Sequence, residues 1–392
     1  MRVWRLFLLG EALSNLGTGL GYAALGLLLA QSGDAFLVAF LGAMGYIAQP
    51  ISLFMGVLVD RFEARWLILA GKLFEAAFWL ALAFLSWSSL SALATAFLVI
   101  LVHDLASHAL NADLTRLKRR ALVGESARFQ NARLLGYFLG ALTGPALVII
   151  SASWPFLLAA CMGMLATGLF RKWPRVPLRH THKPFRFRSV LGGVYYVFTS
   201  PSLRPVLLVS LLIAFTFSLG RSLRPLVGLT LGTPEALLGV FLATATLGGL
   251  GGNSLATRLS VATGFWTGLA LAVSGDLSLA VSRFPLALLF AILGETGYAL
   301  ASAYLRALRQ WLLPSNLLGR GRAAIALLLS IGGLLGAITA GWIGKQNPLL
   351  APAASGALLL ISASWLWLLY NPRRMQRLAD TVSRSPQNNF PE

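Results

Sequence analysis

A small set of ionisable side chains lies inside long apolar stretches of the sequence. These residues are Glu11, Glu75, His103, Asp104, His108 and Glu295. A charge is costly in an apolar environment, and where one is retained it often marks a proton relay or a ligand site. Carboxylates and imidazoles both exchange protons, and histidine does so near neutral pH. These residue types therefore favour proton binding or recognition of a polar ligand.

The spacing within two of these stretches places polar side chains on one face of a helix. Glu11 is followed four residues later by Asn15. Asp104 is followed by His108 and then by Asn111. Residues three and four positions apart share a helix face. We predict that Asp104 and His108 form a titrating pair in a central cavity, with Glu11 as a second acid nearby. The alternative is a structural pair within one helix.

A further polar group stands late in the chain. Glu295 and Tyr298 are three residues apart, and we expect both to line the same cavity, with Glu295 acting on substrate affinity. Glu75 is expected to have a structural role. Two arginines, Arg221 and Arg224, leave two interpretations open: they guide an anionic substrate, or they anchor the end of a helix.

The composition of the chain indicates that lipid is its solvent. The chain has 392 residues, of which 57% are hydrophobic and 11% charged, and its mean hydropathy is +0.74. Soluble domains carry about 25% charged residues. The net charge is +19. Because Lys and Arg lie in short segments between apolar runs, this charge indicates membrane topology and excludes a nucleic-acid-binding surface.

The sequence carries no signature of an enzyme. It contains no Ser-His-Asp grouping, no metal-ligand motif and no phosphate-binding loop. Its single cysteine, Cys161, lies in an apolar run and cannot form an internal disulfide or a cysteine-based metal cluster. We therefore expect no catalytic residue, no cofactor and no metal.

Twelve stretches are apolar enough to cross a membrane as helices, since a span needs about 20 residues. They cover 3–30, 35–59, 67–87, 90–112, 134–152, 154–170, 203–222, 236–256, 261–281, 285–308, 323–343 and 349–370. The predicted fold class is an all-α membrane protein with twelve transmembrane helices in two pseudo-symmetric six-helix bundles.

The longest hydrophilic break divides the chain into two halves. We predict an N-terminal bundle at 1–170, a basic cytoplasmic linker with a surface helix at 171–202, a C-terminal bundle at 203–370 and a cytoplasmic tail at 371–392. With the N-terminus inside, all but four of the 32 Lys and Arg residues lie on the cytoplasmic side. We expect both termini in the cytoplasm and the protein in a bacterial-type inner membrane.

A short charged segment follows the second apolar stretch and reads Gly56-Val-Leu-Val-Asp60-Arg61-Phe-Glu63-Ala64-Arg65. It resembles the G-x-L-x-D-R-x-G-R-R loop of the major facilitator superfamily, with Glu63 at a usual glycine and Ala64 at a usual arginine. In that family the loop latches the two halves together on the cytoplasmic side. The resemblance implies a conformational role for Gly56, Asp60, Arg61 and Arg65.

Regularly spaced glycines mark the fifth apolar stretch. Gly136, Gly140 and Gly144 are four residues apart and are followed by Pro145. Such spacing forms a groove in which another helix can pack closely. The pattern resembles the span-five motif of exporters in the same superfamily. Generic helix packing is the alternative interpretation.

Two further segments resemble the enterobactin-exporter-like branch of this superfamily. One is the glycine–aromatic–Ser-Pro-x-Leu-Arg pattern between Ser189 and Arg204, and the other is Arg309-Gln310-Trp-Leu-Leu-Pro314 with the following Gly-Arg pairs. The resemblance covers most of the chain. It implies export of siderophores, macrolides or other small molecules, usually by proton antiport.

The leading hypothesis is a secondary exporter of a small organic molecule, such as a siderophore-like metabolite or a drug. We expect alternating access, protons as the coupling ion and a monomer in the lipid bilayer. Two alternatives remain open: a lysophospholipid or lipid flippase of the same superfamily, and a non-transporting membrane receptor.

Overall fold

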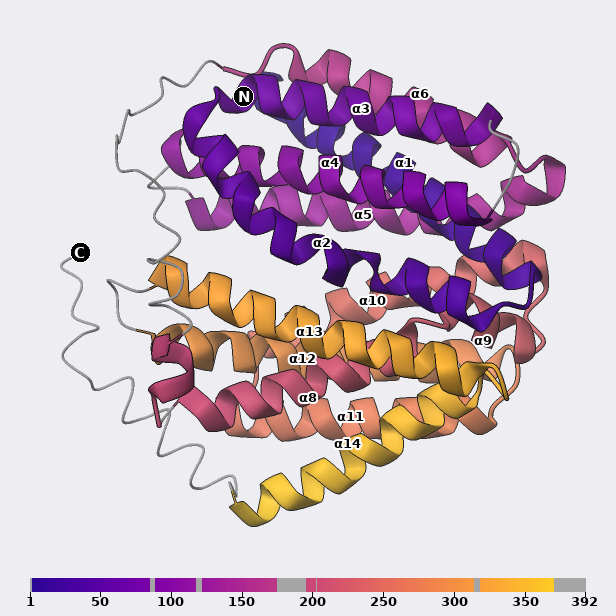
Figure 1. The fold of residues 1–392 in the computed structure, drawn as a ribbon, viewed down its shortest axis with the longest axis vertical. Helices are drawn as coiled ribbons and strands as arrows, with labels where there is room; N and C mark the ends of the chain where they lie inside the picture. The colour runs from indigo at the N-terminus through magenta and orange to yellow at the C-terminus, as the bar shows by residue number, and fades with distance from the viewer. Residues whose placement is uncertain are drawn as a thin grey trace. The chain divides into compact units, whose positions relative to one another are not determined.

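The computed structural model describes residues 2–84, 89–117, 122–174, 195–201, 203–313 and 318–369. Within these ranges the regular secondary structure is helical (Figure 1). The prediction of an all-α protein is confirmed.

Contacts between helices divide the chain into two compact units. Unit 1 contains Met1–Phe185 and Arg224–Thr246, and unit 2 contains Arg186–Leu223 and Leu247–Glu392. The boundary between them passes through one continuous helix, α10 (Leu238–Ala256). The predicted division into an N-terminal bundle, a linker, a C-terminal bundle and a tail stays a prediction.

Unit 1 is organised around its first helix. Its helices are α1 (Arg2–Gln31), α2 (Ala35–Arg61), α3 (Ala64–Phe84), α4 (Ser89–Leu117), α5 (Leu122–Ile150), α6 (Trp154–Phe170) and the short α9 (Arg224–Thr230). α1 packs along α5 and α6, and α3 packs against α4 and α6 (Figure 1). Asp34 begins α2 as its N-cap, since its carboxylate accepts hydrogen bonds from the Phe36 and Leu37 amides.

The evenly spaced glycines of α5 explain its close approach to α1. Each glycine faces a main-chain carbonyl oxygen of α1: Gly136 faces Ala12, Gly140 faces Leu16 and Gly144 faces Leu20. A Cβ atom at Gly140 would overlap the Leu16 oxygen and lie 2.7 Å from the Leu20 nitrogen. The groove is therefore filled by helix backbone, and Pro145 follows it inside α5.

Unit 2 has a second set of long helices, α8 (Leu203–Arg221), α11 (Val261–Val281), α12 (Leu286–Trp311), α13 (Leu318–Gly344) and α14 (Leu350–Leu369). α11 packs against α12 and α14, and α8 packs against α12, α13 and α14 (Figure 1). Their shared core is apolar and includes the buried side chains of Phe265, Leu269, Leu300 and Leu305. The core holds α8, α11, α12 and α14 together, and these helices carry the polar groups described below.

The length and composition of the helices are those of a multi-pass membrane protein. In the described part of the chain, nine helical segments are long and apolar enough to cross a membrane, and 35–51, 154–170 and 350–364 are shorter apolar segments. This is consistent with the twelve predicted spans.

The helix ends show where hydropathy alone falls short. α5 begins at Leu122 and α13 at Leu318, before the predicted starts at 134 and 323, because both helices continue into polar sequence. The predicted seventh span ends as a helix at Arg221, and the separate helix α9 follows it. That short helix was not predicted.

Candidate functional site

A buried ionic cluster in unit 2 joins three helices through one arginine. Arg221, at the end of α8, places its Nη1 2.8 Å and 3.0 Å from the two carboxylate oxygens of Asp276 on α11. Its Nε lies 2.9 Å from Oε1 of Glu295 on α12. The side chain of Asp276 is 1% exposed, and those of Arg221 and Glu295 are 12% and 7% exposed. One guanidinium thus faces two carboxylates inside the helix bundle.

Hydroxyl groups complete the shell around Asp276. Ser355 on α14 and Tyr298 on α12 approach Oδ2 of Asp276, at 2.7 Å and 3.1 Å. The two hydroxyl groups also lie 2.8 Å from each other. The Asp276 carboxylate therefore meets donors from α8, α12 and α14, so it holds these three helices around α11.

Aromatic rings flank the same arginine. The guanidinium carbon of Arg221 lies 4.1 Å from the ring centroid of Tyr298 and 5.3 Å from that of Phe217. A cation near an aromatic face is stabilised by the ring quadrupole. Gly294 leaves the space that this cluster needs, since a Cβ there would lie 2.9 Å from Nη2 of Arg221 and 3.1 Å from Oδ1 of Asp276.

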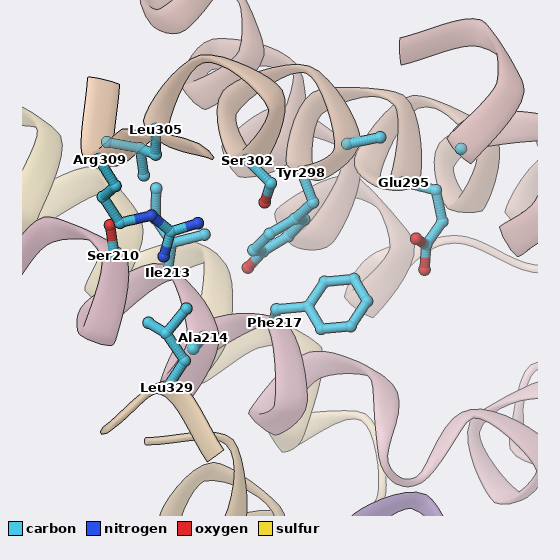
Figure 2. A pocket seen from close by; sticks show the side chains of 12 residues that line it. Ser210, Ile213, Ala214, Phe217, Glu295, Tyr298, Ser302, Leu305, Arg309 and Leu329 are labelled. Atoms are coloured by element: carbon cyan, nitrogen blue, oxygen red, sulfur yellow. The ribbon is translucent and has the colours of Figure 1, made fainter. Parts of the chain in front are cut away.

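A cavity of about 300 Å³ opens beside this cluster within unit 2. Figure 2 shows Glu295 at one end, Arg309 at the other beside Ser210 and Ile213, and the ring of Tyr298 between the two ends. The lining is mainly apolar, with a few polar groups, which is typical of small-molecule sites. The predicted substrate residues Glu295 and Tyr298 both line this cavity.

A second buried ionic cluster lies in unit 1 around Glu11. Its carboxylate oxygens lie 3.2 Å from Nζ of Lys72 on α3 and 3.0 Å from Nε of Arg133 on α5. Asn15, one turn later on α1, donates to the Glu11 main-chain carbonyl at 2.9 Å. Glu11 and Lys72 are almost completely buried. Here a single carboxylate faces two cations.

The neighbouring carboxylate of Glu75 is held by groups from α1 and α4. Thr18 donates to it at 2.5 Å, and the imidazole Nδ1 of His103 lies 3.2 Å from its second oxygen. Ser14 connects Glu75 to Lys72, which is the partner of Glu11. Its hydroxyl group donates to Glu75 at 3.4 Å and accepts from Lys72 at 2.8 Å. Glu11 and Glu75 therefore belong to one polar network inside unit 1.

Asp104 and His108, the predicted titrating pair on α4, are not joined to each other as the residues of these networks are. Asp104 is half-buried and His108 is exposed. Both side chains are described, and no hydrogen bond or ion pair joins them. The side chain of Asn111 lies outside the described residues. The titrating role of Asp104 and His108 stays a prediction.

The loop residues expected to have a conformational role are described only in part. Gly56, Asp60 and Arg61 belong to α2, but their side chains lie outside the described residues. Arg65, at the start of α3, donates through Nη2 to the main-chain carbonyl of Arg171 at 2.7 Å. That contact ties the start of α3 to the end of α6.

Sequence reasoning missed several members of both clusters. Lys72 and Asp276 stand inside apolar runs, so the rule that identified Glu11 and Glu295 applies to them equally. Arg133 and Ser355 carried no such signal. Arg133 lies at the polar border of an apolar run, and serine is common in membrane helices, so only the packing of helices brings these residues to their acids.

Comparison of the chain with known proteins identifies its fold through solved structures. The chain matches no protein-family model and no curated protein. Among solved structures it is similar to the nucleoside transporter NupG, with 11% identity and a TM-score of 0.69 over 95% of this chain and 99% of that one. It is also similar to a POT family transporter in complex with 5-aminolevulinic acid, with 13% identity and a TM-score of 0.74 over 95% and 96% of the two chains.

A third similar structure is the peptide transporter POT in complex with sulfate, with 15% identity and a TM-score of 0.72 over 95% of each chain. At these identities the likeness establishes the fold alone. The predicted major facilitator fold is confirmed. Membership of the enterobactin-exporter-like branch stays a prediction.

Proposed function

We propose that this protein is a proton-coupled secondary transporter that exports a small organic molecule by alternating access. The observation that carries the proposal is the cluster of unit 2, where Arg221 faces both Asp276 and Glu295 beside a cavity. Ionisable groups among membrane-spanning helices are costly, and they are commonly retained for transport of ions or polar substrates. The fold, shared with solved transporters, supports the same function.

Glu295 is the group that we assign to proton exchange in unit 2. With both carboxylates ionised, the three side chains of Arg221, Asp276 and Glu295 together carry one positive and two negative charges, so one proton makes this trio neutral. Glu295 lines the cavity, whereas Asp276 is buried behind it among the hydroxyl groups of Tyr298 and Ser355. A proton that enters through the cavity therefore meets Glu295 first.

Protonation of Glu295 would act on the contact between two helices. The carboxylate of Glu295, on α12, binds Arg221 of α8 at 2.9 Å. A neutral carboxyl group attracts a guanidinium less strongly. A contact of this kind can bias an equilibrium between two conformational states by its differential free energy. The exchange of a proton can thus be coupled to opening of the cavity, and the proton and the substrate do not have to compete for the same atom.

Asp104 with His108 is the second candidate for proton exchange, with Glu11 nearby in the sequence-based hypothesis. The pattern of polar residues on one face of α4 favours it, and Asp104 is half-buried. Variants of Glu295 and Asp104 therefore distinguish two versions of the same proposal, one in each unit.

The test is transport by purified protein in liposomes under an imposed pH gradient. A catechol-containing compound, a macrolide and an aromatic carboxylate would be supplied in labelled form, and accumulation would be compared with protein-free liposomes. We expect accumulation of at least one compound that collapses when the gradient is dissipated. Glu295→Gln should abolish gradient-driven accumulation and retain exchange of labelled for unlabelled compound.

The matched control is Glu235→Gln, because Glu235 is exposed and lies outside both clusters. It should transport like the parent. If Asp104→Asn loses gradient-driven accumulation while Glu295→Gln keeps it, the proton site lies in unit 1. If no compound accumulates in response to the gradient, the proposal of proton-coupled transport is wrong.

The remaining parts of the proposal concern the setting of the protein. We propose an inner-membrane location with both termini in the cytoplasm, and function as a monomer. A lysophospholipid flippase of the same fold is the closest alternative, and movement of a fluorescent lysophospholipid between leaflets would identify it. A receptor without transport is the other alternative, and it would bind a compound without accumulating it.

A further inference from the structure

We propose that the cavity of unit 2 binds a compact organic anion, and that Arg309 holds the negatively charged group of this ligand. The inference deepens the proposed function by naming a substrate class, and it depends on that function for the step from binding to transport. It comes from the position of Arg309 at one end of the cavity, from its charged surroundings and from the apolar wall between the two ends.

The cavity follows one face of α12. The lining residues of this helix include Glu295, Tyr298, Ser302, Leu305 and Arg309, spaced alternately three and four residues apart. That spacing keeps side chains on a single face. The first and last of these residues are separated by roughly 21 Å along the helix axis, at about 1.5 Å per residue. The cavity thus has an acidic end and a basic end, as Figure 2 shows.

The guanidinium of Arg309 has no counter-ion among the described residues. No carboxylate of these residues lies within 4.0 Å of it, whereas the cations of the two buried ionic clusters, Lys72, Arg133 and Arg221, are each paired with an acid. Arg309 is half-buried and lines the cavity beside Ser210, Ile213 and Leu329. Leaving a charge unpaired in such surroundings is costly. An anion in the cavity would remove that cost.

The chemistry of the guanidinium selects the kind of anion. Arginine presents several N–H donors in a planar fork, which matches a carboxylate or phosphate group through two parallel hydrogen bonds. Serine hydroxyls at Ser210 and Ser302 line the same cavity. At the opposite end the carboxylates of Glu295 and Asp276 lie close together, so a negative group there would meet like charges. The anionic group therefore belongs at Arg309.

The rest of the ligand has to fit an apolar wall. The larger apolar and aromatic side chains of the lining include those of Phe217, Tyr298, Ile213 and Leu305. About 300 Å³ is at the lower end of the range for small-molecule sites. A compact aromatic or branched body fits this space better than a long acyl chain. An aromatic carboxylate combines the required charge with the required shape.

Arg309 also lies in the last turn of α12, where a cation stabilises the helix dipole. This structural role would not need the cavity. Arg306 separates the two interpretations, since it has the same charge, lies three residues earlier on the same helix and is exposed outside the cavity. A general electrostatic role would be shared by both arginines, whereas ligand binding belongs to Arg309.

The experiment measures calorimetric binding of three probes of similar shape to the purified full-length protein. The probes are 2-naphthoate, the neutral 2-naphthamide and the cationic 2-(aminomethyl)naphthalene. We expect the parent to bind naphthoate at least about tenfold more tightly than the other two, the size of effect typical for hydrogen bonds to a charged group. Arg309→Gln should lose this preference, and Arg309→Lys should keep part of it because the charge remains but the fork is lost.

Arg306→Gln is the matched control and should bind all three probes like the parent. The inference is overturned if the parent does not bind naphthoate, if it binds the amide or the amine equally well, or if Arg309→Gln keeps the preference. If Arg309→Gln does not fold, Arg309→Lys and the comparison of probes on the parent still decide. Binding is measured without a gradient, so it tests this inference separately from transport. If naphthoate binds through Arg309 but is not transported, the proposed function is contradicted and the inference stands.

Discussion

Nη1 of Arg221 contacts both carboxylate oxygens of Asp276, at 2.8 Å and 3.0 Å, while Nε of the same guanidinium reaches Glu295 at 2.9 Å. Two acids on different helices therefore share one arginine, and each acid is bound by a different nitrogen of its guanidinium. Asp276 is the inner partner and Glu295 is the partner at the cavity. Because the two acids differ in position and in contacts, we expect their substitution to affect the stability of the protein differently.

Asp276→Asn should destabilise unit 2 much more than Glu295→Gln. Removing one partner of a buried ion pair costs up to about 3–5 kcal/mol where the remaining charge is left uncompensated. Here Glu295 still compensates Arg221, so the cost comes mainly from the hydrogen bonds that are lost at Asp276. In Asp276→Asn the arginine loses its two-oxygen contact, and the hydroxyl groups of Tyr298 and Ser355 lose a charged acceptor. In Glu295→Gln the contact between Arg221 and Asp276 remains. Thermal unfolding in detergent measures the difference, and equal unfolding temperatures for the two variants would contradict it.

In unit 1 the expected order follows from the opposite charge balance. Glu11→Gln leaves both Lys72 and Arg133 without their carboxylate, whereas Lys72→Met leaves Glu11 paired with Arg133 at 3.0 Å. We expect a large loss of unfolding temperature for Glu11→Gln and a smaller loss for Lys72→Met.

The double variant Glu11→Gln with Lys72→Met should be more stable than Glu11→Gln alone, since one of the two unpaired cations is removed. A double-mutant cycle measures this coupling from the unfolding temperatures. Simple addition of the two single effects would show that the salt bridge between Glu11 and Lys72 contributes nothing.

The glycine groove between α1 and α5 makes a prediction in which the sign of the effect depends on position. Gly140→Ala should destabilise the protein although alanine is the better helix former by about 1 kcal/mol, because its Cβ would overlap the Leu16 carbonyl. Gly168→Ala is the control: it lies in α6, and a Cβ there meets nothing within 4 Å. This control should be neutral or stabilising. Equal shifts of the unfolding temperature would mean that α1 and α5 can move apart without cost.

The topology prediction comes from the distribution of Lys and Arg. Reporter fusions after Pro174 and after Arg374 should both report the cytoplasm, since basic residues are retained on that side. A phosphatase reporter, active only outside the cytoplasm, and a fluorescent reporter, active only inside, provide opposite readouts at each site. Phosphatase activity at either site would reverse the assignment of the loops.

Much of this protein could be predicted from its sequence because lipid imposes a strict rule. Backbone groups in a membrane must be paired within the same helix, so apolar runs become helices with few alternatives. The predicted spans 3–30 and 261–281 agree closely with α1 and α11. For the same reason a buried charge is conspicuous, and Glu11, Glu75 and Glu295 could be identified as unusual without a structure.

What only the tertiary structure decided is which groups meet. The pairing of Arg221 with Asp276 and Glu295 joins α8, α11 and α12, and nothing in the local sequence relates these positions. Spacing along one helix suggested Asp104 with His108, but intrahelical proximity is only one way to satisfy a charge. The acids that were identified from sequence are partnered across helices, by Lys72 and Arg133 for Glu11 and by His103 for Glu75. Such partners depend on helix rotation and crossing, which the packing of many side chains determines together.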